Sequence, residues 1–77
     1  MSMNSYIPNH AAAVVLSDTT SQFGHALYCG SGGTVILETS GGETVTFTVP
    51  TGGVIIQQFT KVKAGGSATN LVRQWLG

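Results

Sequence analysis

The sequence predicts an all-β protein, either a small antiparallel β-sandwich or a barrel-like meander, with an extended N-terminal arm. Three observations predict this class. Short apolar or alternating runs fill residues 26–63 and are separated by glycine clusters at residues 30–33, 41–42 and 52–53. Alternating runs are typical of half-buried strands, and glycine pairs suit the positive φ angles of tight turns between antiparallel strands. No apolar run approaches the length of about 18 residues that a membrane-spanning helix needs.

Two segments make up the expected organisation, an N-terminal arm over residues 1–15 and a single β domain over residues 16–77. The beginning of the arm shows no hydrophobic periodicity, and Pro8 favours an extended conformation at the residue before it. Tyr6 and Ile7 are the candidate anchors of the arm, and a frayed terminus is the alternative.

The first candidate strand lies in residues 11–16, since adjacent Val14 and Val15 favour extended structure over a helical turn. Residues 17–20 form a polar cluster whose Ser and Asp side chains are expected to bond nearby backbone amides in a turn. Further strands are expected at residues 26–29, 34–39, 43–49, 53–63 and 68–76.

The clearest alternation lies in residues 43–49, where Val45, Phe47 and Val49 are expected to face the core and the intervening threonines to face outward. This run is uncharged from residue 44 onward and rich in β-forming residues, a composition that aggregates through an exposed edge. We therefore expect this strand to be central in the sheet or to have its edge covered by another subunit.

The next strand changes phase at Gln57 and Gln58, which predicts a β-bulge there. After the bulge, regular alternation would place Phe59 and Val62 on opposite faces. The last segment fits either a helix with a serine or threonine cap or a strand with apolar residues on both faces. The all-β context favours the strand.

The amino-acid composition favours association of this chain with other protein. Only 8% of the residues are charged and the formal net charge is zero, which favours association over a free monomer. A chain this short is marginally stable alone, and the single Cys29 cannot form an internal disulfide. Because two histidines and one cysteine do not complete a zinc site at familiar spacing, oligomerisation is the expected source of additional stability.

The same composition limits the partners and the location. No basic stripe is present to neutralise phosphates, which argues against nucleic acid as a partner. No positively charged leader precedes Asp18, so no signal peptide is predicted. We expect a soluble protein made in the cytosol, with no membrane partner and with Cys29 as a free thiol.

No catalytic residues, cofactor or metal are predicted. The glycines of residues 30–33 lack the Lys and Ser/Thr that follow them in a phosphate-binding loop. His25 and Cys29 would share a face of one strand but lie about 13 Å apart, too far for a nucleophile and its base. Glu38 and Glu43 flank a turn, and solvated carboxylates are the favoured interpretation. The chain is therefore predicted not to be an enzyme.

Large aromatic and amide side chains are the candidate interface residues, because aromatic residues are enriched in protein interfaces. The candidates are Tyr6, Ile7, Phe23, Gln57, Gln58 and Trp75. An alternative hypothesis is a small glycan-binding β module, since aromatic and amide side chains also recognise sugars. That site would use Tyr28, Gln57, Gln58 and Trp75.

An ordered set of short motifs runs through residues 16–75: LSDTT, a following phenylalanine, ALYCG, VTF, VPTG, TKVKAG and ATNLV, with a final tryptophan. This order resembles that of the head-spike base proteins of gene transfer agents and their tailed-phage relatives. Gln22 and the Gln57-Gln58 pair depart from the pattern, because a proline and a more basic or aliphatic pair are expected at those places.

The resemblance implies a β-rich, oligomeric structural protein on the exterior of a virion capsid, synthesised in the cytoplasm of the bacterial host. Its implied partners are further copies of itself, as a trimer or pentamer, the major capsid protein, and a fibre or spike protein. A capsid decoration (cement) subunit without a fibre is the alternative within this class. The resemblance transfers no catalytic residue.

Overall fold

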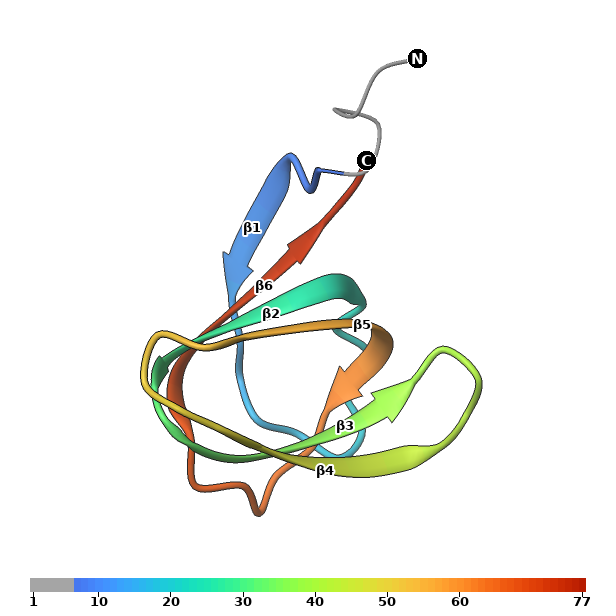
Figure 1. The fold of residues 1–77 in the computed structure, drawn as a ribbon. Coiled ribbons are helices and arrows are strands. Elements are labelled where there is room, and N and C mark those ends of the chain that lie inside the picture. Colours follow the sequence, from blue (N-terminus) through green and yellow to red (C-terminus); the bar gives the residue numbers. More distant parts are fainter. Residues whose placement is uncertain (1–6) are drawn as a thin grey trace.

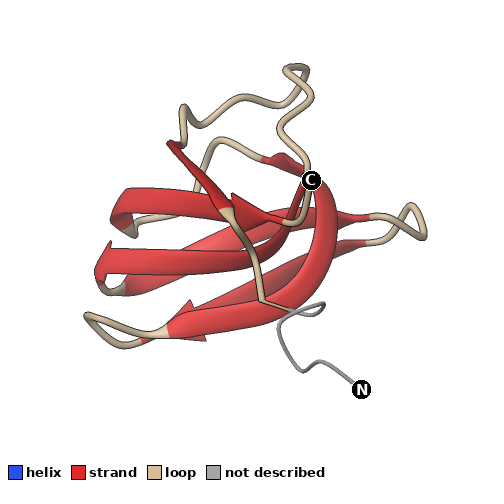
Figure 2. Ribbon diagram, turned by 90° about the horizontal axis from the view of Figure 1, so that it is seen from above, coloured by secondary structure: helices blue, strands red, loops and turns tan. Residues whose placement is uncertain are grey.

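The computed structural model describes residues 7–77, and Tyr6 lies outside this range. The described residues form six strands: β1 (His10–Ala13), β2 (Gly24–Ser31), β3 (Gly33–Thr39), β4 (Thr44–Val49), β5 (Val54–Val62) and β6 (Thr69–Trp75) (Figure 1). Residues 7–77 include no helix (Figure 2), and hence none that could cross a membrane. The final segment, whose sequence fits either a helix or a strand, is the strand β6.

All six strands belong to one antiparallel sheet in the order β1-β6-β2-β5-β3-β4. The sheet curls around its own core (Figure 1). The all-β class is therefore confirmed, and a single curled sheet matches the barrel-like alternative more closely than a two-sheet sandwich. The strand order differs from that of a simple meander, because β5 lies between β2 and β3. Within residues 7–77, β3 and β4 are the only consecutive strands that pair with each other.

The glycine cluster at residues 30–33 makes a bend between β2 and β3 instead of a turn between paired strands. Gly32 alone separates the two strands, and its amide donates a hydrogen bond to Thr51 Oγ1 at 2.9 Å. A Cβ atom at Gly32 would lie 2.5 Å from the Thr51 backbone nitrogen. Glycine is needed here because the turn between β4 and β5 packs directly against the bend.

The β-bulge predicted at Gln57 and Gln58 is confirmed. Gly24 pairs with Phe59, whereas Ala26 pairs with Ile56. Over this stretch β5 therefore contains one residue more than β2. A second irregularity occurs against β3 between Phe59 and Lys61. The expectation that Phe59 and Val62 lie on opposite faces is therefore wrong. The extra residue in β5 places both side chains in the core.

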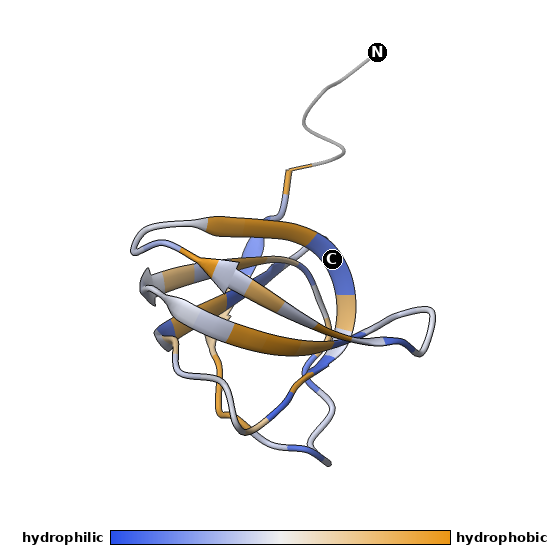
Figure 3. Ribbon diagram, turned by 60° about the horizontal axis from the view of Figure 1, so that its bottom comes forward, coloured by the Kyte–Doolittle hydropathy of each residue, from blue (hydrophilic) through white to orange (hydrophobic). Residues whose placement is uncertain are grey.

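The core lies inside the curled sheet and is supplied mainly by β2, β3 and β5. Its largest fully buried side chains are Leu27, Cys29, Val35, Leu37, Phe59 and Val62. The strongest apolar colouring in Figure 3 falls on strands, while most turns are pale or blue. Because burying a side chain of this size contributes about 1.5–3 kcal/mol, this cluster is the main source of stability for the fold.

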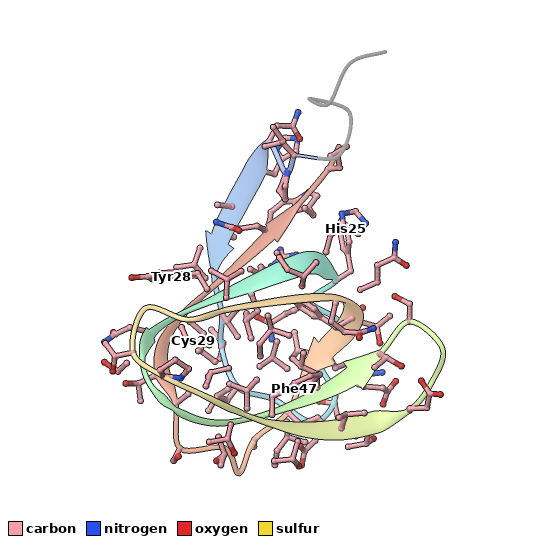
Figure 4. The ribbon with its side chains drawn as sticks, viewed as in Figure 1. His25, Tyr28, Cys29 and Phe47 are labelled. Carbon is pink, nitrogen blue, oxygen red and sulfur yellow. The ribbon has the colours of Figure 1, made fainter. Side chains whose placement is uncertain are left out.

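Strand β4 is an edge strand, so the central position considered for residues 44–49 is excluded. Phe47 and Val49 face the core as expected and pack against it, and Figure 4 shows Phe47 beside the core side chains. Val45 is only partly covered, with 37% of its surface exposed. Cover of the β4 edge by another subunit, the other expectation for this strand, stays a prediction.

Strand β1 lies within the segment expected to be an arm and pairs with β6 from His10↔Trp75 to Ala13↔Val72. The C-terminus lies beside the start of β1, because the Gly77 amide donates to Asn9 Oδ1 at 3.0 Å.

Between β1 and β2, the side chain of Gln22 accepts a hydrogen bond from Val15 N and donates one to Val15 O. A proline at this position would lack the amide side chain that makes both bonds.

Candidate interaction surfaces

Cys29 and His25 do not form a catalytic pair. Cys29 is fully buried in the core, and burial raises the pKa of its thiol, which keeps the sulfur in its unreactive, protonated form. His25 Nδ1 accepts a hydrogen bond from the Leu76 amide at 3.1 Å. The imidazole therefore helps to hold the end of β6 in place.

The two candidate carboxylates have different partners. Lys61 Nζ and Lys63 Nζ lie 3.2 and 3.5 Å from the Glu38 carboxylate, and the hydrogen bond from Lys61 holds the pKa of Glu38 below its usual range. Glu43 Oε1 accepts a hydrogen bond from Thr39 Oγ1 at 2.8 Å. Each carboxylate therefore has a structural role beside the β3–β4 turn. Residues 7–77 contain no group of three His, Cys, Asp or Glu side chains that could hold a metal ion.

An aromatic cluster, defined as His10, Phe23, Arg73 and Trp75, lies where β1 and β6 extend beyond the core. The Arg73 guanidinium is 4.2 Å from the Trp75 ring centroid and 5.6 Å from that of Phe23. His10 stacks on Trp75 with the ring centroids 5.3 Å apart. Phe23 is 48% exposed, so the cluster lies on the surface, where such side chains are typical of protein interfaces.

A second exposed surface lies on the outside of β5, β2 and β6. Tyr28 pairs with Val54 on one side and with Val72 on the other, so these three side chains share a face. Figure 4 shows Tyr28 pointing away from the core that contains Cys29. Ile56 extends the same surface with 80% of its area exposed. We call this surface the outer apolar face; its members are Tyr28, Val54, Ile56 and Val72.

The two glutamines of the bulge lie beside the outer apolar face. Gln57, Gln58 and Ile56 line a hollow with a volume of ≈ 570 Å³. Its other lining residues are Pro8, His25, Ala26 and Leu76. The bulge therefore brings two polar amides next to Ile56, the most exposed of the large apolar side chains in the described chain.

The predicted interface residues fall into separate groups. Phe23 and Trp75 meet in the aromatic cluster, with ring centroids 5.5 Å apart. Gln57 and Gln58 line the hollow, and Ile7 is exposed. Tyr6 lies outside the described residues.

The four residues of the glycan hypothesis do not form one site. Tyr28 pairs with Val72, and Trp75, three residues further along β6, points to the opposite face of the sheet. The Trp75 ring is also already in contact with His10 and Arg73. A sugar could therefore not stack on both aromatic rings at once.

Sequence reasoning missed three contributors to these surfaces, His10, Arg73 and Ile56. Arg73 could have been found, because alternation in β6 places it on the same face as Trp75 and arginine stacks on aromatic rings. His10 could not, because its contact with Trp75 depends on the long-range pairing of β1 with β6.

An all-β fold with exposed aromatic, apolar and edge surfaces is typical of a protein that assembles with other proteins. No protein-family model matches the chain, and no curated protein matches it. Among solved structures, it is similar to a chain in the capsid of a native GTA (gene transfer agent) particle, computed with C5 symmetry. The two chains are 29% identical, with a TM-score of 0.77, over 87% of this chain and 82% of that one.

This similarity confirms the expected resemblance at the level of a capsid-associated chain of a gene transfer agent. It covers most of both chains, so it concerns the whole fold and not one motif. The finer resemblance, to the head-spike base proteins in particular, stays a prediction.

Proposed function

We propose that this protein is a structural component of a phage or gene transfer agent particle, on the exterior of the capsid, as a spike or fibre base or as a decoration subunit. The observation that carries the proposal is the similarity to a GTA capsid chain at 29% identity and a TM-score of 0.77 over most of both chains. The protein acts by binding and catalyses no reaction.

The exposed surfaces support a binding role. The outer apolar face and the aromatic cluster contain no Asp, Glu or Lys and one Arg, Arg73, and they lie on different faces of the sheet. Apolar and aromatic patches of this kind mark protein interaction sites. Two distinct surfaces suit a subunit that contacts both its own copies and a second protein.

The proposed partners follow from this role. They are further copies of this chain in a symmetric trimer or pentamer, the major capsid protein, and a fibre or spike protein if the chain is a base and not a decoration subunit. The location would be the assembled particle, reached after synthesis in the cytoplasm of the bacterial host.

The direct test is electron cryo-microscopy of particles made with and without this chain. The proposal expects density for a six-stranded sheet on the outer surface in the first sample and its loss in the second. Absence of the chain from purified particles, or density confined to the particle interior, would contradict it.

A binding assay then separates the two surfaces. Purified wild-type chain, Ile56→Asp and Trp75→Ala are added to particles that lack the chain, and bound protein is measured after sedimentation. Thr19→Asp, in an exposed turn, is the control for added charge. A loss of binding with Ile56→Asp alone would assign attachment to the outer apolar face, and a loss with Trp75→Ala alone to the aromatic cluster.

A further inference from the structure

We infer that copies of this chain join head to tail through their sheet edges, with β4 of one copy pairing antiparallel to β1 of the next. This inference rests on the proposed function as an oligomeric particle component. It names the strands that make the contact between subunits, which neither the fold nor the similarity to a capsid chain specifies.

The chemistry of the two edge strands is the first argument. Monomeric β proteins protect their edges with charged side chains, prolines within the strand or β-bulges. Here β1 and β4 contain no Asp, Glu, Lys, Arg or Pro, and both irregularities in pairing lie on the interior strand β5. Charges, prolines and bulges are therefore missing from both edges, and the short length of β1, four residues, is the one protective feature that either edge strand has.

The charged residues of the sheet lie on interior strands instead. Glu38 is in β3, Lys61 is in β5 and Arg73 is in β6. Glu38 and Lys61 form an ion pair with each other, and Arg73 stacks on Trp75. None of these charges lies on an edge strand, where it would repel an incoming strand by the cost of its desolvation.

The direction of the edges is the second argument. Each neighbouring pair in the six-stranded sheet is antiparallel, so β1 and β4 run in opposite directions. A second copy in the same orientation would therefore place its β1 antiparallel to β4 of the first and continue the sheet without a break in the pattern. Repetition around a rotation axis closes a ring and covers both edges of every copy.

Self-pairing of β4 across a two-fold axis would also be antiparallel, but it would leave both β1 edges open. Strand β1 is the edge that most needs a partner. It has four residues, three of them alanine, and alanine is a poor strand former, whereas the threonine, valine and phenylalanine of β4 are good ones. Ala11, Ala13, Thr44 and Thr46 are all exposed, so no described part of the chain covers either edge.

A second copy of this chain is the occupant that fits these observations. Each copy carries one β4 edge and one β1 edge of opposite direction, so identical copies satisfy both edges in equal numbers. A strand from a different protein would satisfy one edge and leave the other exposed to uncontrolled addition.

The test uses lysine substitutions on each edge, Thr46→Lys on β4 and Ala13→Lys on β1. Thr46→Ser is the matched control at the same position, and Thr19→Lys is the control for charge in an exposed turn. Oligomeric state is measured by size-exclusion chromatography with light scattering, and circular dichroism confirms that each variant is folded. We expect the wild-type chain and both controls to form the same closed oligomer.

Each lysine variant alone should lose the oligomer and become a monomer. An equimolar mixture of the two should form a heterodimer, because it restores one intact pair: the unmodified β4 of Ala13→Lys against the unmodified β1 of Thr46→Lys. Self-pairing of β4 predicts the opposite, with Ala13→Lys forming a dimer by itself and no gain on mixing.

The outcomes separate this inference from the proposed function. An oligomer that survives folded Thr46→Lys overturns the edge pairing alone and leaves a capsid role intact. A dimer of Ala13→Lys alone overturns the head-to-tail arrangement. A wild-type chain that stays monomeric at high concentration overturns the edge pairing together with the oligomeric part of the proposed function. Capsid attachment is measured separately by sedimentation with particles.

Discussion

Around Phe59, strands β2, β3 and β5 bury a continuous apolar cluster, whereas at the other end of the sheet β1 and β6 extend beyond the core and stack aromatic side chains in the open. Phe59 and Leu37 are fully buried, but Phe23 in the aromatic cluster is 48% exposed. The chain therefore uses one part of its sheet to fold and leaves the other part available for contacts.

The comparison teaches how a chain of 77 residues divides its apolar side chains. A chain this small has too little interior to bury all of them. Those on the inner face of β2, β3 and β5 meet one another because the sheet curls there. Those at the β1–β6 end have no facing layer in the described chain, and they can lose their exposed surface through contact with another protein.

The largest expected effect comes from breaking the core. Phe59→Ala should lower the free energy of unfolding by about 3–5 kcal/mol, because it removes a fully buried ring and leaves a cavity. Ile56→Ala, on the same strand but 80% exposed, is the matched control and should change it by less than about 0.5 kcal/mol. Urea denaturation measures both, and equal losses would contradict the comparison.

A second prediction concerns the close approach of β2 to Phe59. A Cβ atom at Gly24 would lie 2.5 Å from Cζ of Phe59 and 3.2 Å from the Gln74 carbonyl oxygen. Gly24→Ala should therefore lower the free energy of unfolding by about 1–3 kcal/mol through overpacking.

The double variant Gly24→Ala/Phe59→Leu separates this cause from a backbone effect. The smaller leucine makes room for the added methyl group. The double variant should therefore lose less free energy of unfolding than the two single variants lose in sum. Strict additivity in urea denaturation would show that the contact with the ring is not the cause.

The aromatic cluster should contribute less than the core. Trp75→Ala should lower the free energy of unfolding by about 1 kcal/mol, because it removes the cation–π contact with Arg73 and the stacking with His10. Trp75→Phe keeps a ring and should recover part of the loss. If Trp75→Ala lowered the free energy of unfolding as much as Phe59→Ala does, the β1–β6 end would be part of the core.

The smallest expected effect is electrostatic. Since the hydrogen bond from Lys61 lowers the pKa of Glu38, the ionised form stabilises the fold above the usual Glu pKa. That contribution is lost as the pH falls through the lowered pKa. Thermal unfolding should thus show a steeper loss of stability on acidification for the wild-type chain than for Glu38→Gln. Parallel pH profiles would show that the half-buried ion pairs of Glu38 contribute nothing measurable to stability.

Local sequence pattern was sufficient for most of the strands and turns, although residues 30–33 form a bend between two strands that do not pair with each other and not the expected turn. Residues 34–39 and 44–49 alternate as predicted, and the loss of phase at Gln57 and Gln58 identified the bulge. Three of the expected turns are present with a glycine at positive φ, at residues 40–42, 51–53 and 64–67. These features depend on neighbours within a few residues, and side-chain alternation and glycine conformation report such neighbours directly.

The candidate surfaces could be predicted only in part. Phe23 and Trp75 were both named from residue type, but their meeting with Arg73 and His10 depends on β6 lying between β1 and β2. Residue type alone allows glycan binding by Tyr28 and Trp75, but the register of β2 against β6 places the two rings on opposite faces. Residue type selects the candidates, whereas strand pairing decides which of them touch.

The sequence by itself thus determined the all-β class, the approximate positions of most strands and the scarcity of charge, whereas the first strand is His10–Ala13 and excludes Val14 and Val15. Only the tertiary structure decided that β5 lies between β2 and β3, that Phe59 and Val62 share the core, and that residues 44–49 form an edge. The physical reason is that strands bond to partners far along the chain. A strand reveals its two faces in its own alternation, but its neighbours depend on which pairing buries the most apolar surface for the whole sheet.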